Sequence, residues 1–333
     1  MQQAIITASN AEAGDSFGFA VTLSGDTLAV SALNESSRAT GVNMNQSDNT
    51  AQASGAVYIF TRSQIVGGTL WMQQAYIKAS NTDAGDQFGK SIALFGDTLA
   101  VGATGEASSA KGINNAQDDN LAPASGAVYV FQRSGVTWSQ RAYIKASNAA
   151  GLAQFGSAIA LLSDTMIVSA ATEWGAATGI DGNQNDLSKI AAGAVYVFER
   201  NNDVWAQKSY IKASNADMGD QFGASVALSD EVLAVAARLE DSDAVGVNGD
   251  QTNNNAADSG AVYVFRKEGG TWAQRAYIKA SNTETNDWFG VPVALSGDTL
   301  VVAAPQEDGG EMGISGNQAD NRAEDSGAIY VFR

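Results

Sequence analysis

The chain has 333 residues, 19 basic and 36 acidic side chains, and a formal net charge of −17. It contains no cysteine and no histidine, which excludes disulfide bridges, thiolate metal sites and Ser-His-Asp or Cys-His catalysis. Nucleic-acid binding needs a basic surface, so the acidic balance argues against that partner. No apolar run approaches the ~18 residues of a membrane-spanning helix, so we expect no membrane insertion.

Two short sequence words occur five times along the chain. The word F-G, followed by a short apolar pattern, begins at Phe17, Phe88, Phe155, Phe222 and Phe289. The word G-A-[VI]-Y-[VI]-F begins at Gly55, Gly126, Gly193, Gly260 and Gly327. The phenylalanines are 71 residues apart (88 − 17) and then 67 apart three times (155 − 88, 222 − 155, 289 − 222). So regular a period predicts a repeat architecture, and we expect one domain over residues 1–333.

The fourth repeat shows the expected elements in chain order. Residues 222–228 are typical of a strand, and residues 232–237 form a second, apolar strand after a tight turn. A long polar loop over residues 238–258 follows. Residues 260–265 and 272–281 then form two more strands, joined by a glycine-containing hairpin turn. No segment has the 3.6-residue apolar period of a helix.

Four hairpin-connected strands per repeat are typical of the blades of a β-propeller. The F-G strands use small residues freely, so we expect them to be the inner strands, which begin near the five phenylalanines of the F-G words. The chain ends at Arg333, directly after a third strand, and residues 3–10 match the fourth-strand pattern of residues 74–81. The sequence therefore predicts an all-β, five-bladed β-propeller of four-stranded antiparallel blades. Residues 2–10 are expected to close the ring as the outer strand of the last blade.

The order of F-G, then D-T-L-A-V-G-A at Asp97–Ala103, then G-A-V-Y-V-F, resembles the FG-GAP repeat. That family includes the propeller of integrin α subunits and many bacterial surface proteins, and the resemblance covers essentially the whole chain. It implies an interaction propeller that is extracellular or on the cell surface. Met1 leads straight into repeat sequence without a signal peptide, so we expect a mature or excised form. Integrin propellers generally have seven blades, so five is a departure.

The family often holds calcium in a D-x-[DN]-x-D-G loop between the first two strands. Here that connection is a short turn, for example Ser24–Asp26. A turn of this length does not provide the about six to eight oxygen ligands that calcium takes. We therefore do not extend the family's metal role to these turns.

Connections of an up-and-down blade alternate between its two faces, so the linkers between blades and the long loops should share one face. Most of the 36 acidic residues lie in these segments. We call this shared face the acidic loop face. One interpretation is that its charge keeps the protein soluble. Others are a platform for cations or a basic partner, and recognition of a neutral glycan.

Three sets of residues in these segments are candidates for binding. The motif G-[IV]-x-x-x-Q ends at Gln46, Gln117, Gln184, Gln251 and Gln318. These amides either bond to neighbouring backbone or bind a protein or glycan partner. Near them, the candidate oxygen ligands for calcium are Asp48, Asp119, Asp186, Asp250 and Asp320, although their spacing matches no EF-hand loop. Trp174 and Trp288 break the repeat pattern, and they either pack locally or contact a sugar or a partner.

An aspartate precedes F-G by two residues in four repeats, at Asp15, Asp86, Asp220 and Asp287. It either accepts backbone hydrogen bonds in a turn or contributes to a ring of carboxylates that holds a cation. The third repeat has Ala153 at this position, which argues against a required ring.

The sequence therefore predicts a non-enzymatic interaction or adhesion propeller, which binds a partner or cations on its acidic loop face. No paired-carboxylate motif for glycoside hydrolysis is visible. No cofactor is required, calcium is a candidate ligand, and we expect a monomer. One alternative is a lectin that uses the two tryptophans. Another is a structural module or an engineered repeat scaffold.

Overall fold

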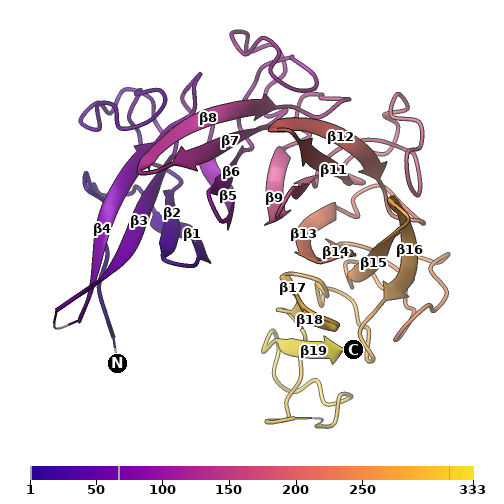
Figure 1. The fold of residues 1–333 in the computed structure, drawn as a ribbon. Coiled ribbons are helices and arrows are strands. Elements are labelled where there is room, and N and C mark those ends of the chain that lie inside the picture. The colour runs from indigo at the N-terminus through magenta and orange to yellow at the C-terminus, as the bar shows by residue number, and fades with distance from the viewer. Residues whose placement is uncertain (1, 67, 315) are drawn as a thin grey trace. The chain divides into compact units, whose positions relative to one another are not determined.

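The structure is a computed structural model that describes residues 2–66, 68–314 and 316–333. Within these ranges every regular element is a β-strand, and the strands form five antiparallel sheets (Figure 1). The all-β class and the five blades of the propeller fold are confirmed. No helix that is long and apolar enough to span a membrane occurs in the part of the chain that the structure describes.

The strands follow one another along the chain in five blades. Blade 1 contains β1 (Phe17–Ser24), β2 (Thr27–Ala32), β3 (Ala56–Ile65) and β4 (Gly68–Ile77). Blade 2 contains β5 (Phe88–Phe95), β6 (Thr98–Ala103), β7 (Ala127–Ser134) and β8 (Thr137–Ile144). Blade 3 contains β9 (Phe155–Leu162), β10 (Thr165–Ala170), β11 (Ala194–Asn201) and β12 (Val204–Ile211). Blade 4 contains β13 (Phe222–Ser229), β14 (Val232–Ala237), β15 (Ala261–Glu268) and β16 (Thr271–Ile278). Blade 5 contains β17 (Val293–Ser296), β18 (Thr299–Ala304) and β19 (Ala328–Phe332).

The chain divides into two compact units. The first comprises Met1–Asp164 and Arg200–Ala206, and holds blades 1 and 2. The second comprises Thr165–Glu199 and Gln207–Arg333, and holds blades 4 and 5. The division passes through blade 3, so the single domain over residues 1–333 stays a prediction.

In blades 1 to 4 the strands lie side by side in chain order, with the F-G strand at one edge of the sheet and the fourth strand at the other (Figure 1). The F-G strand begins with a bulge: Phe222 pairs with Ala237, and the next pair is Ser225 with Ala236. Gly223 lies in this bulge with φ +97°, a conformation that glycine adopts without steric cost. The glycine of the F-G word is therefore explained by the bulge.

The two repeated words meet where one blade packs on the next. A Cβ on Gly55 of blade 1 would lie 2.1 Å from the carbonyl oxygen of Phe88 in blade 2. In the second unit, a Cβ on Gly260 would lie 2.3 Å from the carbonyl oxygen of Phe289. The Phe88 ring is fully buried and meets Tyr129 edge-on, with ring centroids 5.4 Å apart. The core of the first unit therefore lies between blades 1 and 2, where both words contribute to it.

Blade 5 departs from the prediction in two ways. Its F-G strand begins at Val293 rather than near Phe289, because Pro292 has no backbone N–H to donate to the sheet. Its sheet has three strands, and residues 2–10 form no strand in the described structure. Residues 2–10 belong to the first unit and blade 5 to the second, so their pairing as the outer strand of the last blade stays a prediction.

Candidate functional site

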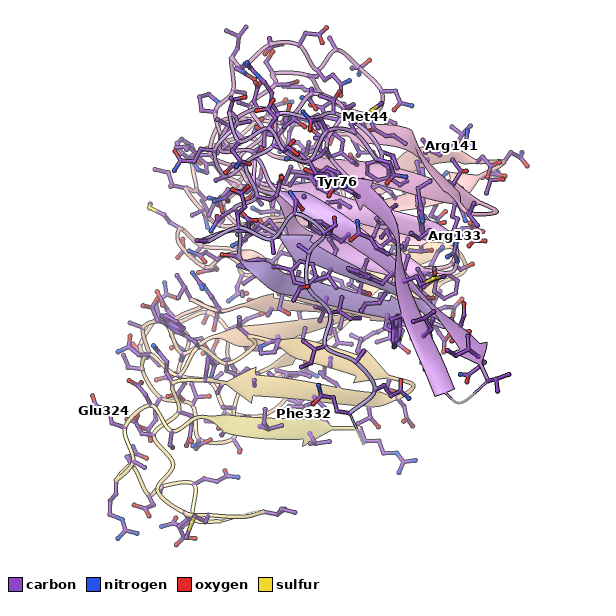
Figure 2. The ribbon with its side chains drawn as sticks, turned by 90° about the vertical axis from the view of Figure 1, so that its left-hand side faces the viewer. Met44, Tyr76, Arg133, Arg141, Glu324 and Phe332 are labelled. Carbon is purple, nitrogen blue, oxygen red and sulfur yellow. The ribbon has the colours of Figure 1, made fainter. Side chains whose placement is uncertain are left out.

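The long loops and the linkers between blades contact each other, as the sequence predicted. Asn49 of the first long loop donates to Glu12 of the first linker at 2.6 Å, and Asn120 donates to Asp83 at 3.0 Å. In the second unit, Asn254 donates to Asp217 at 3.2 Å. Figure 2 shows Met44 among these loops, and Arg133 on the opposite side of the sheets. Each unit therefore has a loop face built from linkers and long loops together.

Each long loop begins with a buried glutamate, and in blade 1 this is Glu35. Its carboxylate accepts from Lys78 Nζ at 2.8 Å, from the Tyr76 hydroxyl at 2.8 Å and from Asn10 Nδ2 at 3.1 Å. The Lys78 side chain is fully buried. Burial lowers the pKa of Lys78, and the Glu35 carboxylate opposes that shift. We name this group the Glu–Lys–Tyr cluster.

The same cluster occurs in blades 2, 3 and 4. Its Lys–Glu distance is 2.5 Å for Lys145 and Glu106, 2.9 Å for Lys212 and Glu173, and 2.8 Å for Lys279 and Glu240. Lysine and tyrosine come from the fourth strand or its end, whereas glutamate comes from the long loop. Each cluster therefore fixes the base of a long loop against the outer strand of its own blade.

The glutamines of the G-[IV]-x-x-x-Q motif join neighbouring blades. Gln117 accepts a hydrogen bond from Ser80 Oγ at 2.9 Å, and its backbone carbonyl accepts from Asn81 at 3.1 Å. Ser80 and Asn81 follow the outer strand of the preceding blade. The corresponding serine–glutamine pairs are Ser9 with Gln46, Ser214 with Gln251, and Ser281 with Gln318. Gln184 is also engaged with a partner. This geometry favours the interpretation that the amides hold the loops in place.

The candidate calcium ligands stabilise their own loops and lie in separate loops. Asp48 accepts from the amide and the hydroxyl of Thr50 at 2.9 and 2.7 Å, which lowers the pKa of Asp48. Asp250 bonds Thr252 in the same way, Asp119 bonds Ser109 and the Leu121 amide, Asp186 accepts from the Ser188 amide, and Asp320 pairs with Arg322. Across residues 2–66, 68–314 and 316–333, no three Asp, Glu, His or Cys side chains gather closely enough to hold a metal ion.

The aspartates two residues before F-G close the linker turns. Asp86 accepts from the Asp83 amide at 2.8 Å and is buried. Burial raises the pKa of Asp86 to about 7, and the nearby Glu106 adds to that shift. Burial likewise raises the pKa of Asp220 to about 7 and that of Asp287 to about 6. This geometry favours the turn role.

The two unique tryptophans lie in different segments of the second unit. Trp288 is half-buried in the linker before β17, and the Arg238 guanidinium lies 5.3 Å from the centre of its ring. Arg238 also donates to Gln221 at 2.8 Å, so Trp288 packs against a fixed cation. Trp174 is half-buried in the long loop of blade 3, where its carbonyl accepts from the Lys189 amide at 3.1 Å.

Sequence reasoning missed the exposed apolar side chains of the long loops. In the first unit they are Met44 and Leu121, at 58 and 79% exposure. In the second unit the most exposed are Met312 and Ile314, at 99 and 97%. The signal was present in the sequence as single apolar residues inside polar loops. The sequence interpretation assigned the loop surface to the acidic residues instead, although several of them, including the glutamates of the clusters, are buried.

The loop face is hollowed in both units. In the first unit a depression of about 580 Å³ is lined by Glu12, Asp15, Asn34, Asn49 and Gln52, among others. In the second unit a depression of about 530 Å³ lies between the loops of blades 4 and 5, and its lining includes Val245, Asn282, Glu284, Asn317 and Gln318. Amides and carboxylates line both, and Val245 adds an apolar side chain to the second.

Four-stranded antiparallel sheets that repeat along the chain define a protein of the β-propeller class. The family model for the FG-GAP repeat matches residues 1–60, 71–131, 138–198, 205–265 and 272–332. The chain therefore belongs to the FG-GAP repeat family, and the resemblance seen in its sequence is confirmed. No curated protein sequence matches the chain.

Proposed function

We propose that this chain is a non-enzymatic protein-interaction propeller, and that its partner binds the long loops of blades 4 and 5. The observation that carries the proposal is the set of exposed apolar side chains on these loops, Val245, Val247, Met312 and Ile314. Apolar side chains surrounded by polar ones are the usual composition of a protein-binding surface. FG-GAP propellers are commonly protein-interaction modules, which supports this choice.

Charge and rigidity favour the same surface. Asp243, Glu284 and Glu311 are exposed on these segments, so a partner with basic residues around an apolar centre fits best. The base of the blade 4 loop is fixed by Glu240, Lys279 and Tyr277. A loop that is already ordered loses less conformational entropy when a partner binds.

Affinity purification with quantitative mass spectrometry tests the proposal. The variant carries Val245→Asp and Ile314→Asp, and the control carries Val136→Asp, which changes an exposed apolar residue in the hairpin turn of blade 2. We expect the double variant to lose a partner that the wild-type chain and the control retain. Retention of every partner by the double variant contradicts the proposal.

The family also bears on location. FG-GAP repeats typically occur in extracellular or surface proteins, so we propose that the loop face meets its partner outside the cell. The lectin alternative stays a prediction. Glycan-array binding that is lost in Trp174→Ala would favour it over a protein partner.

A further inference from the structure

The tryptophan at the start of the outer strand is paired in blade 2 but unpaired in blade 4. In blade 2, the indole Nε1 of Trp138 donates to Gln74 Oε1 of the preceding blade at 2.8 Å. In blade 4, the counterpart Trp272 is only 4% exposed, and its Nε1 has no hydrogen-bond partner among the described residues. A buried N–H without an acceptor is costly, so this nitrogen requires an explanation.

The missing acceptor has been replaced by a lysine. Trp138 and Gln74 are 64 residues apart, and the residue 64 positions before Trp272 is Lys208 (272 − 208 = 64). Lys208 is exposed on β12 and pairs with no carboxylate among the described residues. A lysine offers donors and no acceptor. Two donors therefore occupy the repeat positions that hold a donor and an acceptor between blades 1 and 2.

The ring of Trp272 has also lost its stacking partner. Arg133 lies opposite Trp138 on the neighbouring strand, and its guanidinium is 5.3 Å from the centre of the ring. Lys267 lies opposite Trp272 and pairs with Glu199 of blade 3 instead. Both departures from the repeat therefore fall on the same tryptophan of blade 4.

Trp272 lines a depression of about 530 Å³ between the long loop of blade 3 and β16. Its lining also includes Ile180, Ser214, Asn248, Phe265 and Gln274. All of these residues belong to the second unit. The volume falls within the range of small-ligand sites, roughly 300–1,000 Å³. The unpaired indole N–H is therefore part of a hollow large enough for a ligand.

The amide side chains of the depression keep one donor and one acceptor available. Gln274 Nε2 donates to Ser214 Oγ at 3.1 Å, and Gln274 Oε1 has no donor among the described residues. Asn248 Oδ1 accepts from the Tyr277 amide at 3.0 Å, which leaves its Nδ2 as a donor. A hydroxyl group both donates and accepts. Neighbouring hydroxyl groups on a sugar ring match this pair of amides.

We propose that this depression binds a uronic acid, which is a sugar with a carboxylate on its ring. The carboxylate accepts a hydrogen bond from Trp272 Nε1 and pairs with the Lys208 ammonium group. Hydroxyl groups of the ring donate to Gln274 Oε1 and accept from Asn248 Nδ2. Hydrogen bonds and ion pairs to a carboxylate are stronger than those to a neutral acceptor, so an acidic sugar is preferred over a neutral one.

This site is distinct from the other binding surfaces of the chain. Arg275 also lines the depression, but it pairs with Glu268, so Lys208 is the cation left for a ligand. The proposed protein partner contacts loop residues of blades 4 and 5 that do not line this depression. Trp174 and Trp288, the tryptophans of the lectin alternative, do not line it either.

Calorimetric titration of the full chain tests the proposal. The probes are D-glucuronate and D-galacturonate, with D-glucose and acetate as comparators. We expect at least one uronate to bind saturably, and both comparators to bind at least about tenfold more weakly, because each lacks one half of the recognised groups. Failure of both uronates to bind overturns the proposal. Equal binding of glucose or of acetate overturns it as well, because the carboxylate or the sugar ring would then have no role.

Two tryptophan variants locate the binding. Trp272→Phe keeps an aromatic ring and removes the N–H, so uronate binding should be at least about tenfold weaker. Trp138→Phe is the matched control, because it removes the same volume from blade 2 and should leave uronate binding unchanged. Without ligand, Trp138→Phe should lower the urea midpoint of unfolding more than Trp272→Phe does, since only Trp138 loses a hydrogen bond. Uronate binding that is equal in the two variants contradicts the assignment.

Two substitutions of the exposed Lys208 decide the question even if Trp272→Phe does not fold. Lys208→Gln restores the acceptor that Gln74 provides to Trp138, so it should raise the urea midpoint and abolish uronate binding. Lys208→Arg keeps the cation and should retain binding. Unchanged binding in Lys208→Gln overturns the proposal. The loop variant with Val245→Asp and Ile314→Asp should retain uronate binding, so failure of the proposed function and failure of this site are distinguishable.

Discussion

Lys78 Nζ lies 2.8 Å from Glu35 Oε2, and both side chains are buried beneath the first long loop. This pair is repeated in the next three blades with the same tyrosine beside it. The blade 4 cluster, with Lys279 and Glu240, therefore fixes the base of one of the two loops that the proposed partner contacts.

Loss of one partner of this pair should be strongly destabilising. Lys78→Met leaves Glu35 buried without its cation, and we expect the free energy of unfolding to fall by about 3–5 kcal/mol. Urea denaturation followed by tryptophan fluorescence measures the change. Arg275→Met is the matched control, because it removes an exposed pair with Glu268 and should cost about 1 kcal/mol or less. Equal effects of the two substitutions would show that the buried cluster is not a major source of stability.

Asp86 and Asp220 should make stability fall as pH rises toward neutrality. Burial raises the pKa of both to about 7 in the folded protein, whereas the ordinary value in the unfolded chain is 3.8. Their contribution is therefore complete below pH 3.8 and is lost as pH rises to about 7. We expect the double variant Asp86→Asn, Asp220→Asn to have a flatter stability profile over this range than the wild-type chain.

Thermal unfolding from pH 4 to pH 8 measures this difference. Asp48→Asn is the matched control and should leave the profile over this range unchanged in shape, because hydrogen bonds from Thr50 lower the pKa of Asp48 and its contribution is constant above pH 3.8. That contribution is present above the unfolded value of 3.8 and is lost as pH falls below it. Parallel profiles for the wild-type chain and the double variant would mean that the two buried carboxyls do not titrate in this range.

The glycine of the G-A-[VI]-Y-[VI]-F word should be irreplaceable for a packing reason. Gly55 has φ +83°, and a Cβ there would lie 2.1 Å from the Phe88 carbonyl oxygen. Gly41 has nearly the same φ, +81°, but a Cβ there meets nothing within 4 Å. We expect Gly41→Ala to cost about 1 kcal/mol from backbone strain. Gly55→Ala should cost at least about 2 kcal/mol more, because blades 1 and 2 have to move apart. Denaturation midpoints that differ little between the two variants would contradict this account.

The strands of the blades could be predicted from the sequence because each depends on residues within its own segment. Gly223 marks the bulge at the start of β13, and the apolar run of residues 232–237 marks the buried β14. The fourth strand of blade 5 has no such local signal, and its assignment to residues 2–10 stays a prediction. Residues 2–10 have the right pattern, but pairing with β19 depends on a contact across nearly the whole chain rather than on a local turn.

The site was harder to read because charge in a loop does not reveal burial. Glu35 and Glu12 look alike in the sequence, yet Glu35 is buried and Glu12 is exposed. A usable signal was Lys78 inside the otherwise apolar run A-Y-I-K-A, since a lysine buried there requires an acidic partner. The role of the glutamine motif was ambiguous for another reason. Gln117, for example, bonds Ser80 of the preceding blade, and a contact between blades is not visible in the sequence of one repeat.

The contact between Ser214 and Gln251 should stabilise the chain without contributing to partner binding. Gln251 Oε1 accepts from Ser214 Oγ at 2.8 Å, so Ser214→Ala and Gln251→Ala should each cost about 1 kcal/mol, and the double variant should cost less than the two effects added together. A double-mutant cycle by urea denaturation measures this coupling. Affinity purification with Gln251→Ala should retain the partner that Val245→Asp with Ile314→Asp loses. Additive stability effects together with loss of the partner in Gln251→Ala would instead assign the glutamine to binding.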